Sequence, residues 1–166
     1  MEVICWIGLG LIVLFGVAAL TGAPFVPSVK SEVRDAFKKL YPLGKKDFIV
    51  DLGSGDGRVQ KVASEFGAKG LGIEINPLLV FAAKWRLRKC KDQKTICGSM
   101  YAIDFPAETT VVYTFCDNRD IKKIVRHCKK QAEKLGHSFY LISHAFDTKD
   151  AELVKQHRAY YLYKIE

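Results

Sequence analysis

The chain has 166 residues, enough for a domain of ordinary size with its own hydrophobic core. Hydrophobic residues make up 49% and charged residues 27%, a composition that argues against intrinsic disorder. The net charge of +8 suits an anionic partner, such as nucleic acid or anionic lipid. The five cysteines show no CxxC spacing, so neither a disulfide framework nor a metal site is expected.

The chain begins with an apolar segment. Residues 3–20, VICWIGLGLIVLFGVAAL, carry no charge and come close to the minimum needed to cross a bilayer core, about 17–25 residues. A cleaved signal peptide is less favoured, because no basic residue precedes the segment and Pro24 follows the only small-residue cleavage candidate. A buried apolar helix is also less favoured, because the segment is apolar on all faces. We therefore expect a single transmembrane helix within residues 1–22 and one domain over residues 23–166.

The charge next to this segment predicts an orientation. Basic residues follow the segment and none precedes it, which by the positive-inside tendency places the domain on the cytoplasmic side of a membrane, or on the mitochondrial matrix side.

Helices and strands alternate after the apolar segment. We expect an amphipathic helix over residues 29–40 with Ser28 as its N-cap, a strand over residues 47–53, and a helix over residues 57–66 that ends at Gly67. A second strand over residues 69–75 is followed by a helix with Asn76 as N-cap and Pro77 in its first position.

The second half continues this pattern. Strands are expected over residues 95–100, 109–116, 137–145 and 158–166, with a helix over residues 121–135. The tail after Ala145 is short, so a reduced terminal hairpin is expected. The alternation predicts an α/β fold, a Rossmann-like, doubly wound and mostly parallel sheet with helices on both faces.

A glycine-rich loop, GSGDG at residues 53–57, follows the first strand. Its three glycines allow a ligand to approach the backbone closely, and the next helix offers free N–H groups. The loop departs from the dinucleotide fingerprint GxGxxG, because Arg58 stands where the third glycine would fall. Asp51, just before the loop, would repel a pyrophosphate and would suit a ligand that carries a cation.

A second acid narrows the range of possible ligands. Glu74 ends the second strand, 21 residues after Gly53, where an acid accepts hydrogen bonds from a ribose diol. A ligand with a ribose, a positive centre and no pyrophosphate is predicted, and S-adenosylmethionine meets all three conditions. A glycine turn without a ligand and an NAD-dependent enzyme are the less favoured alternatives.

Two motifs carry a family resemblance. DLGSGDGR (51–58) and GIEINP (72–77) resemble the first two motifs of the class I S-adenosylmethionine-dependent methyltransferases, over roughly residues 45–145. With the apolar N-terminus and PFVPS (24–28), the chain is similar in particular to the small membrane-anchored protein-lysine methyltransferases that act on the adenine nucleotide translocase and the ATP synthase c-subunit. In that family the segment matching residues 25–28 closes over the cofactor. The resemblance implies cofactor contacts from Phe25, Pro27, Asp51, Gly53, Ser54, Gly55, Asp56, Gly57, Glu74, Ile75, Asn76, Ser99 and Met100.

The chain departs from the family pattern at two strand ends. Ser99 stands where many members have an acid near the adenine, and CDNRD (116–120) replaces an Asn/Asp-Pro-Pro-aromatic motif. Candidates near the transferred methyl group are Asp117, Asn118, Ser143 and His144. The alternatives are helix capping for Asp117 and Asn118 and a purely structural role for His144. Aromatic faces that could stabilise a cation, or could simply belong to the core, are those of Phe25, Tyr101 and Phe115.

These features predict a methyltransferase. An attacking lysine, with an ordinary pKa of about 10.4, must lose its proton, and desolvation lowers that pKa. The resemblance implies a lysine of a membrane-associated protein as acceptor. A small-molecule, lipid or quinone acceptor and a non-catalytic binding module are the alternatives. For the lysine-rich helices a solvated face is expected first, contact with anionic lipid second and nucleic acid last.

Overall fold

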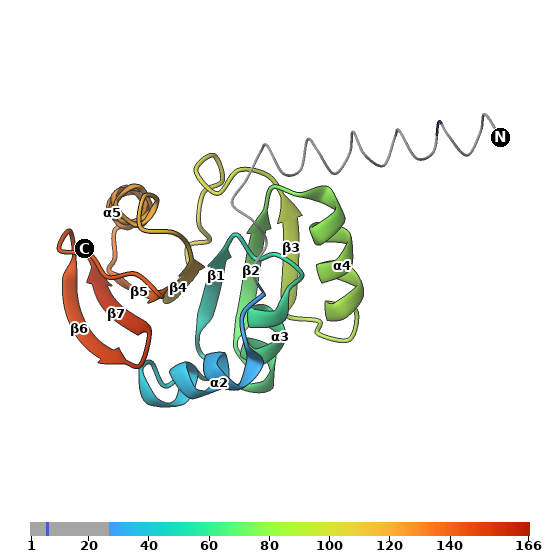
Figure 1. Ribbon diagram of the computed structural model, residues 1–166, viewed down its shortest axis with the longest axis horizontal. Helices are drawn as coiled ribbons and strands as arrows, with labels where there is room; N and C mark the ends of the chain where they lie inside the picture. The colour runs from blue at the N-terminus through green and yellow to red at the C-terminus, as the bar shows by residue number, and fades with distance from the viewer. Residues whose placement is uncertain (1–5, 7–26) are drawn as a thin grey trace.

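A single mixed sheet organises the part of the chain that the computed structural model describes, which is Trp6 and residues 27–166 (Figure 1). The strands run in the order β3-β2-β1-β4-β5-β7-β6. In chain order the elements are α2 (Lys30–Lys39), β1 (Phe48–Leu52), α3 (Arg58–Glu65), β2 (Lys69–Glu74), α4 (Pro77–Leu87), β3 (Gln93–Cys97), β4 (Val111–Phe115), α5 (Ile121–Leu135), β5 (Phe139–His144), β6 (Glu152–His157) and β7 (Tyr160–Ile165).

The sheet is parallel except at one edge. β1 pairs in parallel with β2 and β4, while β7 pairs antiparallel with both β5 and β6. The chain first builds outward from β1 through β2 to β3, and then returns to place β4 on the other side of β1. The doubly wound, mostly parallel α/β sheet expected from the sequence is confirmed.

Helices cover both faces of the sheet. Val111 and Tyr113 of β4 belong to the core cluster on the side of α2 and α3, whereas Val112 between them belongs to the cluster on the side of α5. This alternation follows from the period of two along a strand. α4 packs beside α3 and against β2 and β3, so α2, α3 and α4 form one layer and α5 lies on the opposite face (Figure 1).

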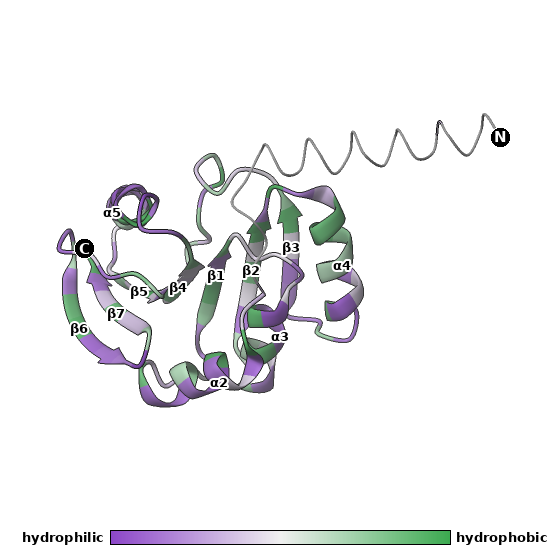
Figure 2. Cartoon of the chain, viewed as in Figure 1, coloured by the Kyte–Doolittle hydropathy of each residue, from purple (hydrophilic) through white to green (hydrophobic). Residues whose placement is uncertain are grey.

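The distribution of hydropathy matches this arrangement (Figure 2). The strands in the middle of the sheet are largely hydrophobic, because both of their faces are covered. β6, at the edge, is largely hydrophilic and exposed. Polar residues on an edge strand discourage pairing with other chains.

Three expectations about local structure were wrong. Ser28 is not the N-cap of α2: Val29 holds that position without a side-chain cap, while the Ser28 hydroxyl lies 3.3 Å from the Tyr113 hydroxyl. The third strand covers Gln93–Cys97 rather than residues 95–100, so Ser99 and Met100 lie in the turn beyond it. The terminal hairpin is not reduced, because β6 pairs with β7. β6 was missed because its sequence, ELVKQH, lacks apolar alternation.

The expected membrane anchor, residues 1–22, lies outside the described residues except for Trp6. Among the helices that the structure describes, none is long and apolar enough to cross a membrane.

Candidate active site

The polar residues singled out in the sequence gather at one edge of the sheet. The glycine loop follows β1, Glu74 ends β2, Asp117 follows β4 and His144 ends β5. Because parallel strands share a carboxyl edge, these positions lie along one line in strand order. The crevice expected at such an edge opens where the winding reverses, which here is between β1 and β4.

The glycine loop has a backbone shape that depends on its glycines. Gly53, Gly55 and Gly57 all have positive φ angles, of 74°, 53° and 76°. The amides of Gly53 and Ser54 donate to the carbonyl of Ile73 in β2, at 2.9 and 3.1 Å, which fixes the start of the loop against the neighbouring strand. The left-handed conformation is costly for residues with a Cβ, so the loop is built for glycine.

The last glycine of the loop serves the packing of helices. A Cβ on Gly57 would lie 3.1 Å from the Cβ of Ala83 and 3.2 Å from a methyl group of Leu87, both in α4. The missing side chain therefore lets α3 and α4 approach each other closely. The cofactor contact predicted for Gly57 remains a prediction.

Glu74 is buried and held by the backbone around it. Its two carboxylate oxygens accept hydrogen bonds from the amide of Gly55, at 2.9 Å, and from the amide of Asn76, at 2.8 Å. Each carboxylate oxygen has two lone pairs, so both can accept a further bond. Glu74 thus ties the glycine loop to the start of α4 and keeps capacity for a ligand hydroxyl pair.

Asp51 is a buried acid at the carboxyl end of β1. Its side chain is 2% exposed, and its Oδ2 has no hydrogen-bond partner among the described residues. Burial, together with the negative charges of Glu74 and Asp56, raises the pKa of Asp51 to about 8. A buried carboxyl group without a partner is costly, and a cationic group beside it would relieve the cost.

Asp56 is engaged by two arginines. Its Oδ2 lies 3.0 Å from Nε of Arg58 and 2.7 Å from Nη1 of Arg86. These ion pairs connect the glycine loop to the helices that follow it. The cofactor contact predicted for Asp56 remains a prediction, and its side chain already has structural partners.

The remaining cofactor candidates surround this loop. Asn76 caps α4 by accepting from the amide of Leu78 at 3.0 Å, as the sequence predicted, and Ile75 beside it is half exposed. The Met100 methyl lies 4.0 Å from the position of a Cβ on Gly53, so the turn after β3 meets the glycine loop. The Ser99 hydroxyl accepts from the Tyr101 amide at 3.3 Å.

The segment before α2 is described only in part. Pro27 is exposed, and Phe25 lies outside the described residues. Ser28, buried against Tyr113, brings the start of this segment to β4, whose Tyr113 pairs in register with Asp51.

Asp117 and Asn118 lie in the turn between β4 and the helix α5, which begins at Ile121. The Asp117 carboxylate accepts from the backbone amides of Arg119, at 2.7 Å, and Asp120, at 3.2 Å, and pairs with the Arg119 guanidinium. The hydrogen bond from Arg119 lowers the pKa of Asp117. The N-cap of α5 is Asp120, so neither Asp117 nor Asn118 caps this helix: Asp117 holds the turn before it, and Asn118 is exposed. A catalytic role for either residue remains a prediction.

His144 is held between two aromatic rings. Its imidazole stacks on Tyr160, with ring centroids 4.2 Å apart and planes at 5°, and lies 4.2 Å from the ring of Phe115. Burial lowers the pKa of His144, so the ring is neutral near pH 7. Its Nδ1 is buried and has no hydrogen-bond partner among the described residues. A neutral imidazole with a free nitrogen can accept a proton.

Two tyrosines of this region were not predicted from the sequence. Tyr113, in β4, reaches Ser28, and Tyr160, in β7, stacks on His144. Burial raises the pKa of Tyr160 to about 12, so its hydroxyl is uncharged at neutral pH. An aromatic residue in the last strand was the available signal, but the sequence did not show that β7 turns back beside β5.

Solved structures that superpose on this chain are methyltransferases. No family model matches the chain. The structure of an RNA methyltransferase from Salinibacter ruber, in complex with S-adenosyl-L-homocysteine, superposes with a TM-score of 0.72 and 26% identity, over 84% of this chain and 92% of that one. A putative methyltransferase from Escherichia coli, yhhF, superposes with a TM-score of 0.65 and 16% identity, over 87% and 90% of the two chains.

The chain has the class I methyltransferase fold.

Within this fold, the similar sequences are lysine methyltransferases. The ATP synthase c-subunit lysine N-methyltransferase from Xenopus laevis is 36% identical over 63 residues, which are 38% of this chain and 27% of the relative. The enzyme of the same name from Caenorhabditis elegans is 29% identical over 99 residues, 54% of this chain and 52% of the relative. The alignments thus cover between about a quarter and a half of these relatives' length.

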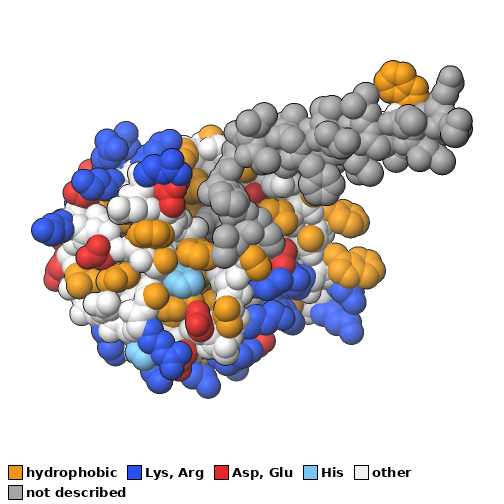
Figure 3. Space-filling view, viewed as in Figure 1, with side chains coloured by type: hydrophobic (Ala, Val, Ile, Leu, Met, Phe, Trp, Pro, Cys, Tyr) orange, Lys and Arg blue, Asp and Glu red, His pale blue; other side chains and the backbone are white. Residues whose placement is uncertain are grey.

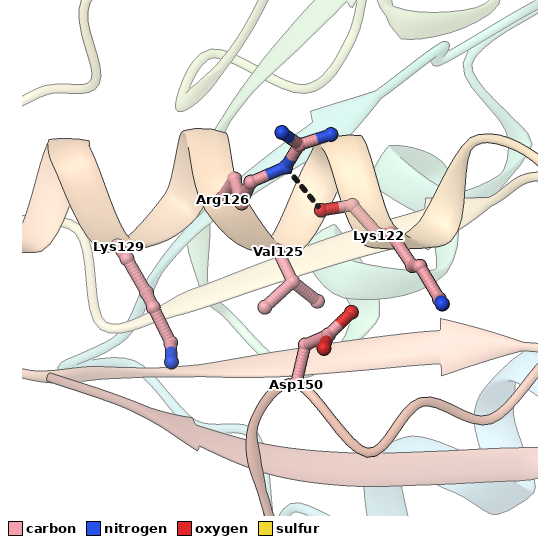
Figure 4. Close-up of a pocket in the computed structure, with 5 residues that line it drawn as sticks. All are labelled: Lys122, Val125, Arg126, Lys129 and Asp150. Atoms are coloured by element: carbon pink, nitrogen blue, oxygen red, sulfur yellow. Dashed lines mark hydrogen bonds between the residues drawn. The ribbon is translucent and has the colours of Figure 1, made fainter.

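A separate groove of about 390 Å³ lies between α5 and the segment before β6 (Figure 4). Its lining residues are Lys122, Val125, Arg126, Lys129 and Asp150. None of them is among the candidate active-site residues at the carboxyl ends of the parallel strands. The groove is therefore a different feature, lined by three cationic side chains and one carboxylate, with the Arg126 guanidinium directed away from Asp150.

Proposed function

We propose that the chain is an S-adenosylmethionine-dependent methyltransferase. The observation that carries the proposal is the buried pair of acids at the glycine loop, Asp51 with a free oxygen and Glu74 held by two amides. Two carboxylates suit a ligand with an ammonium group and a ribose, and they disfavour a pyrophosphate. The similar Salinibacter ruber enzyme, crystallised with S-adenosyl-L-homocysteine, supports the same cofactor.

The residues present fit this cofactor. Asp51 would accept from the cationic amino-acid part, Glu74 would accept from the ribose hydroxyls, and Ile75 and Met100 would provide apolar contact to the base. When bound, the cofactor supplies a methyl group on a positively charged sulfur, which leaves as the neutral thioether. The work left to the protein is alignment, which can be worth about 7–11 kcal/mol.

For the acceptor, we propose a lysine side chain of a membrane-associated protein. The support is the similarity to lysine N-methyltransferases that are named for the ATP synthase c-subunit. The amine must be neutral when it attacks, so the site needs a proton acceptor. His144 is the best candidate, because its ring is neutral near pH 7 and one nitrogen is unpaired among the described residues.

We further propose a single-pass membrane location. Residues 3–20 are uncharged and would form the anchor, and the basic residues after them would keep residues 30–166 on the cytoplasmic or matrix side.

RNA methylation is a second candidate, favoured by two observations. The Salinibacter ruber neighbour is an RNA methyltransferase, and the groove beside α5 presents Lys122, Arg126 and Lys129 (Figure 4). Cations of this kind contact phosphates without regard to sequence. Asp150 in the same groove weakens this reading, because a carboxylate repels a phosphate.

Transfer of a labelled methyl group separates these functions. The full chain is incubated with labelled S-adenosylmethionine and with a membrane fraction, total RNA or extracted lipid, and Asp51→Asn protein serves as the inactive control. Label in a protein band, located on a lysine by mass spectrometry, is the expected result. Label in RNA, or label that enters organic solvent, would overturn the protein-lysine proposal in favour of that acceptor. Cofactor binding without any transfer would support a binding module instead.

A further inference from the structure

The helix α4 carries a second apolar face that is largely exposed in the described part of the chain. Leu78, Phe81 and Trp85 are 46%, 72% and 66% exposed, and their spacing of three and four residues places them in one stripe. The opposite face of the same helix, with Val80, Ala83 and Leu87, is buried against the body of the domain. α4 is thus apolar on two sides, whereas an ordinary surface helix is apolar on one.

The charge around the stripe has a single sign. Between Glu74 and Asp92 there is no acidic residue, while Lys84, Arg86, Arg88, Lys89 and Lys91 are all basic. Arg86 is engaged with Asp56. Lys84 follows Phe81, and Arg88 follows Trp85, by three residues, so both lie beside the stripe. The Arg88 guanidinium stacks on Trp85 at 4.4 Å from the ring centre.

Figure 3 shows this surface. Hydrophobic side chains stand out from the molecule at the right of the view, where Figure 1 places α4, with Lys and Arg side chains next to them. Figure 2 shows the same helix as hydrophobic along most of its length and hydrophilic at its end.

We propose that this α4 face, defined by Leu78, Phe81 and Trp85 and flanked by Lys84 and Arg88, lies on the surface of an anionic membrane. Tryptophan and phenylalanine side chains typically lie at the boundary between the lipid headgroups and the acyl chains. Lysine and arginine side chains pair with anionic headgroups. Charge complementarity selects an anionic lipid surface as the occupant.

The contact would orient the enzyme. α4 begins directly after Glu74 and Asn76, so the apolar stripe starts at the edge of the sheet that holds the candidate active site. With α4 on the membrane, that edge is kept near the bilayer rather than turned away from it. The inference does not depend on which acceptor is methylated or on whether methyl transfer occurs.

The two tryptophans of the chain make the proposal testable. In the full chain with Trp6→Phe, Trp85 alone reports on α4. The protein is reconstituted into vesicles that contain a phosphatidylserine-type anionic lipid, with or without bromine atoms near the headgroup end of the acyl chains. We expect the brominated lipid to quench Trp85 fluorescence by at least about twofold, because a docked ring lies at that depth.

Two matched variants control the measurement. In Trp6→Phe/Trp85→Phe/Leu153→Trp protein, the reporter is on β6, at the edge of the sheet opposite β3, and should not be quenched. In Trp6→Phe/Lys84→Gln/Arg88→Gln protein, the ratio of docked to undocked α4 should fall about 25-fold, at about fivefold per cation.

Three results would overturn the proposal. Equal Trp85 fluorescence in brominated and ordinary vesicles, with the protein bound to both, would leave the face to a protein partner. Shielding of Trp85 from solvent that occurs only in concentrated protein, without lipid, would assign the α4 face to contact with a second copy of the chain. Failure of the protein to associate with vesicles at all would also exclude a membrane surface. Calorimetric binding of S-adenosylmethionine, measured in parallel, keeps these outcomes separate from any failure of the proposed function.

Discussion

Asp51 is expected to make the folding stability of the cofactor-free protein depend on pH. Its pKa in the folded protein, about 8, lies above the ordinary value of 3.8, because the carboxyl group is buried. The folded state therefore binds more protons than the unfolded state between those two values, and the contribution of Asp51 to stability falls as the pH rises through this window. The slope reaches about 1.4 kcal/mol per pH unit.

Asp51→Asn removes this titration. We expect the unfolding free energy of wild type, relative to Asp51→Asn, to fall steadily as the pH is raised from about 4 to about 8. Urea denaturation at several pH values measures it, and taking the difference cancels the histidines and the other carboxylates. Parallel profiles for the two proteins would mean that Asp51 does not titrate in this range.

Glu74 is expected to be the main ribose contact. In Glu74→Gln one carboxylate oxygen is replaced by an amide nitrogen, which donates and cannot accept, and hydrogen bonds to charged groups contribute about 1.5–3 kcal/mol. Affinity for S-adenosylmethionine should therefore fall about tenfold to a hundredfold. Glu133→Gln, an exposed change on α5, serves as control. Undiminished affinity in Glu74→Gln would remove the ribose assignment.

His144 can be tested without disturbing its stack. His144→Phe keeps an aromatic ring between Phe115 and Tyr160 but removes the proton acceptor. If the imidazole accepts the proton of the attacking amine, turnover should fall about a hundredfold or more while cofactor affinity stays the same. His137→Phe, at an exposed position, should leave both unchanged. Wild-type turnover in His144→Phe would show that the histidine is structural.

At the scale of elements, the contact between α3 and α4 depends on Gly57. Gly57→Ala adds the cost of a left-handed alanine, about 1–2 kcal/mol, and also places a Cβ against Ala83 and Leu87. Gly136→Ala is the matched control, because Gly136 has a similar φ of 74° but nothing within 4 Å of an added Cβ. We expect Gly57→Ala to lower the unfolding free energy by about 1–3 kcal/mol more than Gly136→Ala. Equal losses of unfolding free energy in the two variants would mean that α3 and α4 shift apart and accommodate the added Cβ.

The sequence predicted the elements whose signals are local. The helix α4 was located by Asn76 and Pro77, and α5 by its apolar period, and both agree with the structure. β6 was not found, because its residues are exposed and its place depends on pairing with β7. Ser28 was misassigned for a similar reason: its partner, Tyr113, is 85 residues away in the chain.

The candidate site divides in the same way. The glycine loop, Asp51 and Glu74 could be predicted as candidate site residues because they lie in two short sequence motifs. The aromatic stack around His144 could not, since Phe115 and Tyr160 come from strands on opposite sides of β5. Nothing in the sequence indicated that Asp56 is held by Arg86, an ion pair between the loop and α4.

At the scale of the whole molecule, the protein combines a class I methyltransferase fold with a surface that we propose meets a membrane. The sheet gathers its acids at one edge, and α4 leads from that edge to the exposed apolar face. The proposed anchor, residues 1–22, and the α4 face would together fix both the location and the orientation of the domain. The proposed chemistry rests on the identity of the cofactor.

Calorimetric titration of the full chain in detergent, with S-adenosylmethionine and with NAD as control, tests that identity most directly. We predict micromolar binding of S-adenosylmethionine and none of NAD. Below pH 8, binding should release a proton from Asp51, seen as a dependence of the heat on buffer ionisation that Asp51→Asn lacks. Binding of NAD, or of neither ligand, would contradict the assignment of the glycine loop and its two acids to S-adenosylmethionine.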